Sequence, residues 1–185
     1  MLRKARQALT RAAASDGWGP DTEWFASDRD GHIAVLSTAG LGPIPARATT
    51  DPAGHVAVWE SLEILGEPKG FGELDFYDTA VAPRVGAFAF DYSGPQGGYG
   101  QYAPRQPYRL IATPGNPVSA EQLSPEARTH LAAVCFRVTC FADIDALVVE
   151  DTFESLHRPT VWDRFSDKNE LPPVAARPPQ PPDEL

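Results

Sequence analysis

Two apolar runs flank a tight-turn signal close to the N-terminus, in the stretch TEWFASDRDGHIAVLST (residues 22–38). Runs that contain Trp, Phe, Ile and Val on either side of a turn such as Asp28-Arg29-Asp30-Gly31 are typical of two antiparallel β-strands. The sequence therefore predicts a β-hairpin over these residues, which is the clearest element in the chain.

Glycine and proline dominate the next stretch, AGLGPIPARATT, and predict an irregular, sharply turned loop over 39–50. A helix should follow, because Asp51 can cap it, Pro52 suits its first position and apolar residues recur at helical spacing. We therefore expect a helix over 52–65. A strand over 55–59 is the alternative, since a glycine and β-branched valines disfavour a helix.

Alternating small and aromatic residues in RVGAFAFDYS (84–93) predict a strand at the centre of a sheet. Ala87 and Ala89 would let a helix approach one face, while the aromatic side chains fill a core on the other. A glycine-rich segment leads from this strand to a second one, YRLIATP (108–114). We expect the two strands to pair as a hairpin with a long loop.

The region after these strands predicts one more helix and one more strand. Ser124 can cap a helix that has Pro125 at its first position, and VCFRVTCF (134–141) predicts a strand after it. Alternate residues of that strand, Val138 among them, would share one face. The apolar centre of FADIDALVVEDTFES (141–155) is compatible with a short strand or with part of a helix.

Together these elements predict an α+β fold, a mainly antiparallel β-sheet with two to four helices packed on it. A chain of 185 residues can bury one sizeable core and is short for two, so residues 1–170 are expected to form a single domain. The basic segment 1–15 predicts a short surface helix. Residues 171–185 contain six prolines and almost nothing to bury, which predicts a disordered tail.

Charge is unevenly distributed along the chain. The first fifteen residues carry four positive charges and no acid, and the rest holds 12 Lys and Arg against 25 Asp and Glu, a net charge of −13. An acidic body repels nucleic acid and anionic membranes, and it speeds association with a basic protein. We therefore expect a basic protein partner, no nucleic acid and no membrane, and a monomer or a homodimer. The candidate contact residues are acids of 141–155 and tyrosines in and beside the glycine-rich segment: Asp143, Asp145, Glu150, Asp151, Glu154, Tyr92, Tyr99 and Tyr102.

Targeting signals and cysteine content both favour the cytoplasm. No run approaches the roughly 20 apolar residues of a membrane helix, and the N-terminus lacks the apolar core of a secretory signal. The two cysteines, Cys135 and Cys140, predict reduced thiols on opposite faces of a strand. We therefore expect a cytoplasmic protein.

Residue types that catalyse reactions or bind metals occur without a recognisable motif. Neither cysteine has a Cys or His at metal-ligand spacing. The four histidines also have no partners at catalytic or metal-ligand spacing: His32, His55, His130 and His157. Asp28 and Asp30 are explained by turn capping, and His32 is most simply a strand-edge residue beside them. The sequence thus predicts no catalytic residue, no metal and no cofactor. An enzyme would have to combine these three side chains with distant residues.

Residues 24–45 resemble the opening of a group of poorly characterised bacterial proteins. In that group a Trp strand, a D-x-x-G turn, an apolar strand and a G-x-G-P-[IV]-P loop occur in this order, as in WFASDRDGHIAVLSTAGLGPIP here. Some members are grouped with the immunity proteins of polymorphic toxin systems. The resemblance implies a non-enzymatic protein that binds and occludes a cognate toxin, and a basic nuclease would suit the acidic body. The alternative is a small-molecule sensor that uses a cleft between helix and sheet.

Overall fold

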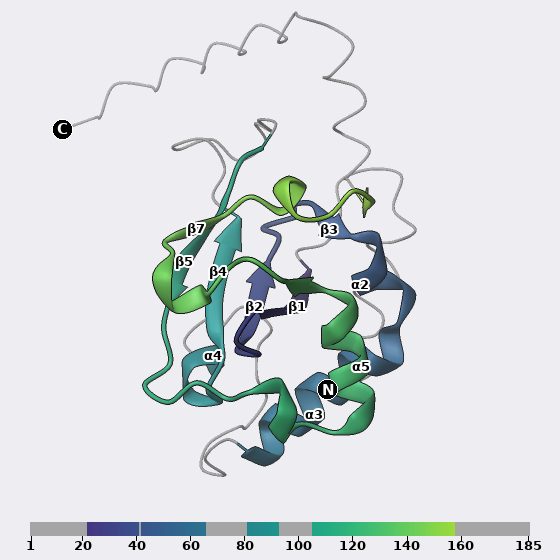
Figure 1. Cartoon of the computed structure of the whole chain (residues 1–185), viewed down its shortest axis with the longest axis vertical. Helices are drawn as coiled ribbons and strands as arrows, with labels where there is room; N and C mark the ends of the chain where they lie inside the picture. The colour runs from purple at the N-terminus through teal and green to yellow at the C-terminus, as the bar shows by residue number, and fades with distance from the viewer. Residues whose placement is uncertain (1–21, 41, 66–80, 93–104, 158–185) are drawn as a thin grey trace, which may run out of the picture.

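The computed structural model describes residues 22–40, 42–65, 81–92 and 105–157 (Figure 1). The helix predicted over 1–15, the glycine-rich segment and the tail predicted over 171–185 lie outside these ranges. Within them, no helix is both long enough and apolar enough to cross a membrane.

Among the residues that the structure describes, six strands form the main sheet, in the order β6-β1-β2-β4-β5-β7. Their bounds are β1 Glu23–Asp28, β2 Ile33–Ser37, β4 Phe88–Tyr92, β5 Tyr108–Ala112, β6 Cys135–Phe136 and β7 Ala146–Leu147. A separate antiparallel pair joins β3 (Ile44–Pro45) to β8 (Leu156–His157). The predicted hairpin is confirmed by the antiparallel pairing of β1 with β2. The predicted pairing of the two later strands is confirmed as β4 with β5.

The sheet is mixed, and the expectation of a mainly antiparallel sheet was wrong. β2 pairs parallel with β4, and β6 pairs parallel with β1. A parallel neighbour requires the chain to cross back over a face of the sheet before the next strand. Between β2 and β4 the chain forms α2 (Ala46–Thr50), α3 (Pro52–Leu65) and α4 (Val81–Arg84), and α5 (Pro125–Ala133) precedes β6. These helical connections produce the two parallel pairs.

The two predicted helices begin where their caps place them. The carboxylate of Asp51 accepts a hydrogen bond from the Gly54 N–H at 2.9 Å, and α3 covers the predicted residues 52–65. Oγ of Ser124 accepts one from the Ala127 N–H at 3.3 Å, at the start of α5. The loop expected over 39–50 is only partly irregular, because β3 and α2 form in its second half. Pro45 caps α2 with φ −55°, a value that suits the entry to a helix.

Each face of the sheet carries its own core, and α3, α4 and α5 cover one face, whereas Ala48 of α2 packs in the core on the other (Figure 1). Ala87 and Ala89 face the helical layer, where they pack with apolar residues of α3, α4 and α5. Phe88, Phe90 and Tyr92 point into the opposite core. The predicted division between small and aromatic residues is therefore confirmed, and the small side chains let the helices lie close to the sheet.

The strand predicted over 134–141 was wrong for most of its length. β6 contains two residues, after which the chain turns and leaves Val138 84% exposed. The turn lets the fully buried Phe141 enter the aromatic core, where its ring packs against Phe90 and Phe136. Filling this core outweighs the strand preference of the local sequence.

The segment 141–155 covers the aromatic face of the sheet. It forms the short turn η2 (Phe141–Asp143), then β7, then η3 (Val149–Asp151). Its apolar centre therefore contains both a short strand and a helical turn, the two structures with which its sequence is compatible. Leu147 and Val149 are buried in the core, so this segment forms one outer wall of the domain.

Candidate functional site

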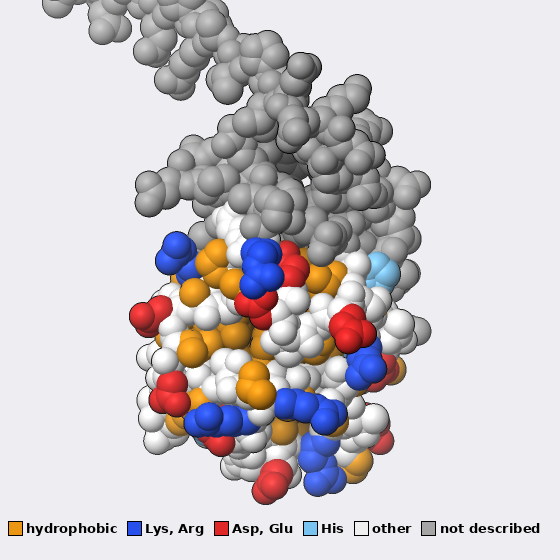
Figure 2. All heavy atoms as spheres, turned by 45° about the horizontal axis from the view of Figure 1, so that its top comes forward, with side chains coloured by type: hydrophobic (Ala, Val, Ile, Leu, Met, Phe, Trp, Pro, Cys, Tyr) orange, Lys and Arg blue, Asp and Glu red, His pale blue; other side chains and the backbone are white. Residues whose placement is uncertain are grey.

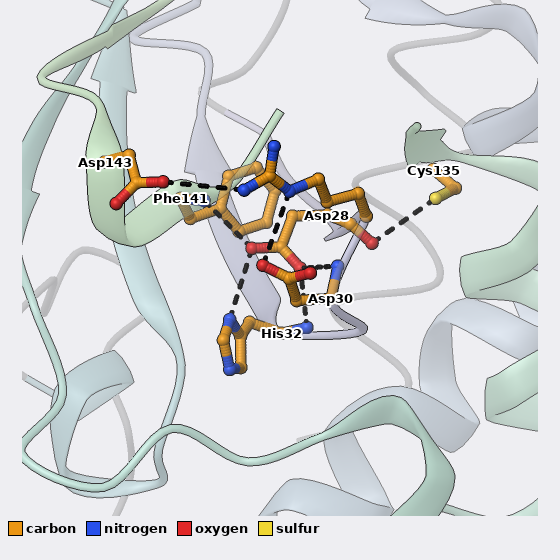
Figure 3. Close-up of polar contacts among 7 residues, drawn as sticks. Asp28, Asp30, His32, Cys135, Phe141 and Asp143 are labelled. Carbon is orange, nitrogen blue, oxygen red and sulfur yellow. Dashed lines mark hydrogen bonds and ion pairs between the residues drawn. The ribbon is translucent and has the colours of Figure 1, made fainter. Parts of the chain in front are cut away.

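The turn between β1 and β2 is built around the carboxylate of Asp28, whose side chain is fully buried (Figure 3). Its Oδ1 accepts hydrogen bonds from the backbone N–H groups of Asp30, at 2.9 Å, and His32, at 2.8 Å. Gly31 has a φ of 82°, a conformation that glycine adopts without a steric penalty. The Asp-x-x-Gly pattern that predicts the turn therefore also fixes an aspartate inside it.

A distant segment docks on the same turn. The Phe141 N–H donates to Oδ2 of Asp28 at 2.9 Å, and the Arg29 N–H donates to the Thr139 carbonyl at 3.0 Å. The Cys135 thiol donates to the Asp28 carbonyl oxygen at 3.5 Å (Figure 3). These contacts hold the chain that follows β6 against the hairpin.

Four side chains that can bind a metal ion meet at this contact: Asp28, Asp30, His32 and Cys140. Each offers one ligand atom, and these atoms all lie within 4.8 Å of one another. Nδ1 of His32 lies 3.3 Å from Oδ2 of Asp28. Beside this group, Arg29 forms ion pairs with Asp30 at 3.5 Å and with Asp143 at 3.7 Å (Figure 3).

The sequence places three of these side chains in one turn but gives no sign that Cys140 lies beside them. Asp28, Asp30 and His32 belong to one turn, whereas Cys140 lies more than a hundred residues further along the chain. Spacing along the chain holds no signal for such a contact, because the docking of Phe141 on Asp28 creates it. The prediction of no metal rested on that spacing and on turn capping as the role of Asp28 and Asp30.

Cys140 is 8% exposed, with its thiol among carboxylates. The Ala142 backbone N–H is the largest single influence on the pKa of this thiol and lowers it. Burial and the carboxylates of Asp30, Asp143 and Asp28 together outweigh it, so the pKa is raised. A nucleophilic cysteine needs a lowered pKa, and this environment therefore does not suit one.

A second group of titratable side chains lies between α3 and α5. The rings of His55 and His130 have centroids 6.0 Å apart, and Nδ1 of His130 lies 3.4 Å from Oδ2 of Asp51. Burial and then the charge of His130 lower the pKa of His55 to about 3. Burial also lowers the pKa of His130, although Asp51 acts in the opposite direction. Both rings are neutral core groups at neutral pH.

An open groove of about 560 Å³ lies beside the segment 141–155. One side consists of Asp151, Glu154 and the residues between them, and the other includes Cys135, Arg137 and the exposed Val138. Acidic, basic and apolar side chains are interspersed over the face shown in Figure 2. A groove of this mixed character differs from the enclosed, mainly apolar cavities that bind small molecules.

Comparison with known proteins does not distinguish between the possible functions, a protein-binding domain or a small-molecule sensor. No family model, curated protein or solved structure matches this chain. The resemblance of residues 24–45 to immunity proteins therefore stays a prediction, and the function has to be inferred from the chain's own side chains.

The predicted contact residues do not all reach the surface. Four acids of the segment 141–155 are exposed: Asp143, Asp145, Asp151 and Glu154. Both carboxylate oxygens of Glu150 are buried, although the residue as a whole is half-buried. Tyr92 is 1% exposed, since it belongs to the aromatic face of β4 and packs against Tyr108. Tyr92 is therefore corrected from a contact residue to an interior residue, the carboxylate of Glu150 does not reach solvent, and Tyr99 and Tyr102 lie outside the described residues.

Arginines neutralise part of the acidic surface. Asp143 pairs with Arg29, and Asp151 pairs with Arg105. Of the four exposed acids of the segment 141–155, Asp145 and Glu154 have no ion pair with a residue that the structure describes. Their carboxylates are the ones that can meet the cations of a partner without first breaking an internal pair.

Proposed function

We propose that this chain is a non-enzymatic bacterial protein-binding domain, an immunity protein that neutralises a cognate toxin by binding a basic surface of it. The observation that carries the proposal is the open groove bordered by Asp151 and Glu154. Its exposed apolar residue, Val138, supplies area that binding would remove from water. Arg47 and Arg137 also line the groove, so it suits a partner that presents charges of both signs around an apolar centre. Glu154, which has no ion pair with a described residue, would meet a Lys or Arg of that partner.

The structure of the outer wall, the segment 141–155, favours a protein partner rather than a small molecule. The segment 141–155 buries Phe141, Leu147 and Val149 against the sheet while Asp145 and Glu154 face solvent. The wall is therefore held by the core and presents its charges on a rigid support. Charges fixed in this way raise the rate of association with an oppositely charged surface.

The resemblance of residues 24–45 to immunity proteins is the reason for proposing a toxin as the partner. Binding and occlusion of a toxin need no active site, and the environment of Cys140 disfavours a nucleophile. The contacts of Asp28 explain the D-x-x-G turn of the resemblance as a structural device, since its carboxylate closes the turn and anchors Phe141.

Co-expression with the products of adjacent genes tests the proposal. We expect the tagged chain to capture a basic polypeptide encoded beside it, and to restore growth to cells in which that polypeptide is toxic. Capture should weaken as salt is raised from about 50 to 300 mM, because opposite charges drive the association. Absence of both capture and growth rescue would contradict the proposal.

A further inference from the structure

The four potential ligands at the β1–β2 turn have the chemistry of a zinc site. Imidazole, thiolate and carboxylate are the groups that bind Zn²⁺ in proteins, and the soft thiolate favours Zn²⁺ over Mg²⁺ or Ca²⁺. They come from two segments, Asp28 to His32 and the chain around Cys140, that are joined by the Phe141 hydrogen bond. The site is therefore positioned by the fold and does not depend on the ion to bring the segments together.

The distance between His32 and Asp28 fits a shared metal. Bonds of about 2.0–2.1 Å from Zn²⁺ to nitrogen and oxygen, at the tetrahedral angle, place two ligand atoms about 3.3 Å apart. Nδ1 of His32 and Oδ2 of Asp28 are separated by 3.3 Å. An ion can thus bond to both atoms from one side of the line that joins them, while the Phe141 N–H keeps its hydrogen bond to the same oxygen.

The other two ligands lie on the same side of the turn. Cys140 is buried to more than nine-tenths, and its thiol lies with the Asp30 carboxylate among ligand atoms that are all within 4.8 Å of one another. Contraction to tetrahedral spacing can be met by rotation of the Asp30 side chain, which is 48% exposed and makes a surface ion pair with Arg29.

We propose that Asp28, Asp30, His32 and Cys140 bind one Zn²⁺ ion. Four protein ligands fill a tetrahedral shell, so the ion is structural. Coordination releases the thiol proton to solvent and leaves the imidazole proton on Nε2. The ion joins the β1–β2 turn to the chain after β6, and so it braces one side of the groove. This inference is independent of the identity of any protein partner.

Cobalt(II) is the probe that tests the site, because a cobalt–thiolate bond produces a charge-transfer band in the near ultraviolet. Metal-free full-length protein should bind one Co²⁺ per chain with this band, and Zn²⁺ should displace it. Cys140→Ser should abolish the band, and His32→Gln should weaken Zn²⁺ binding at least tenfold, since even outer-shell changes at zinc sites cost about 10–100-fold. Cys135→Ser is the matched control and should keep the band and the affinity.

Thermal unfolding with Zn²⁺ provides a second readout. The unfolding temperature should rise with Zn²⁺ concentration in the wild type and in Cys135→Ser, because the ion binds the folded state. It should not rise in Cys140→Ser, whose fold circular dichroism would verify. A wild-type protein with neither the cobalt–thiolate band nor the Zn²⁺-dependent shift would overturn the proposal, as would a band that survives in Cys140→Ser and disappears in Cys135→Ser.

Discussion

The carboxylate of Asp28 accepts a hydrogen bond from the backbone N–H of Phe141, 113 residues further along the chain. The same carboxylate accepts the N–H groups of Asp30 and His32, so one buried side chain closes the hairpin turn and fastens a distant segment to it. That segment continues into 141–155, the outer wall beside the groove. The candidate metal site and the candidate binding surface therefore share one anchor.

Asp28→Asn should lower the free energy of unfolding by about 2 kcal/mol or more. Asparagine fits the same space, but it has one acceptor oxygen, and its amide group would face one of the three N–H donors that Asp28 now satisfies. Urea denaturation measures the change. In the metal-free protein Asp30→Asn is the control, because the half-exposed Asp30 side chain makes a surface ion pair, and it should cost under about 0.5 kcal/mol. Equal stability of the two variants would show that Asp28 does not anchor Phe141.

The buried histidines between α3 and α5 predict a loss of stability as the pH falls. The pKa of His55 is lowered to about 3 in the folded protein, mainly by burial, whereas an unfolded histidine has its ordinary pKa of 6.5. As the pH falls, His55 therefore binds a proton in the unfolded state at a higher pH than in the folded state. Stability should be full above about pH 6.5 and should decrease by about 1.4 kcal/mol per pH unit below it for this one group. His130, whose pKa is also lowered, adds to the slope.

Unfolding free energies between about pH 7.5 and 5 measure this slope, above the range in which ordinary carboxylates titrate. His55→Gln removes the group and should flatten the slope, even if lost packing against Phe25 lowers stability at every pH. A His55→Gln slope as steep as that of the wild type would mean that another group controls the acid sensitivity.

Gly54→Ala should destabilise the protein by about 1–3 kcal/mol, although alanine is the better helix former. A Cβ atom at this position would lie 2.7 Å from Cβ of His130 and would collide with the capping carboxylate of Asp51. Glycine is required here because α3 and α5 approach closely. Gly115→Ala is the control, since nothing lies within 4 Å of its added Cβ, and it should change stability by less than about 0.5 kcal/mol. Thermal or urea unfolding of both variants decides between these outcomes.

Local signals predicted the elements whose structure is determined locally. The turn at Asp28 and Gly31, the cap at Asp51 and the cap at Ser124 all act within a few residues, and each prediction is confirmed. The glycine that weakened the helix prediction for α3 is explained by a contact with α5, which no local pattern contains.

Predictions failed where contacts between distant segments decide the structure. The strand expected over 134–141 gives way to a turn because Phe141 fills the aromatic core, and the same contact brings Cys140 to the carboxylates. Tyr92 and the carboxylate of Glu150 were expected at the surface, but both are buried. The parallel pairs of the sheet likewise follow from the paths of the helical connections, which the order of the elements did not reveal.

The double variant Asp145→Lys/Glu154→Lys tests the proposed binding surface most directly, by co-precipitation and affinity measurement with the product of the adjacent gene. Glu60→Lys/Glu121→Lys makes the same charge change at exposed acids on α3 and on the turn before α5, and is the matched control. We predict that the wild type and the control bind with similar affinity and that the Asp145/Glu154 variant binds at least about tenfold more weakly, since fixed charges of the wrong sign repel a basic partner. Equal loss of binding in the two variants, or no loss in either, would contradict the account.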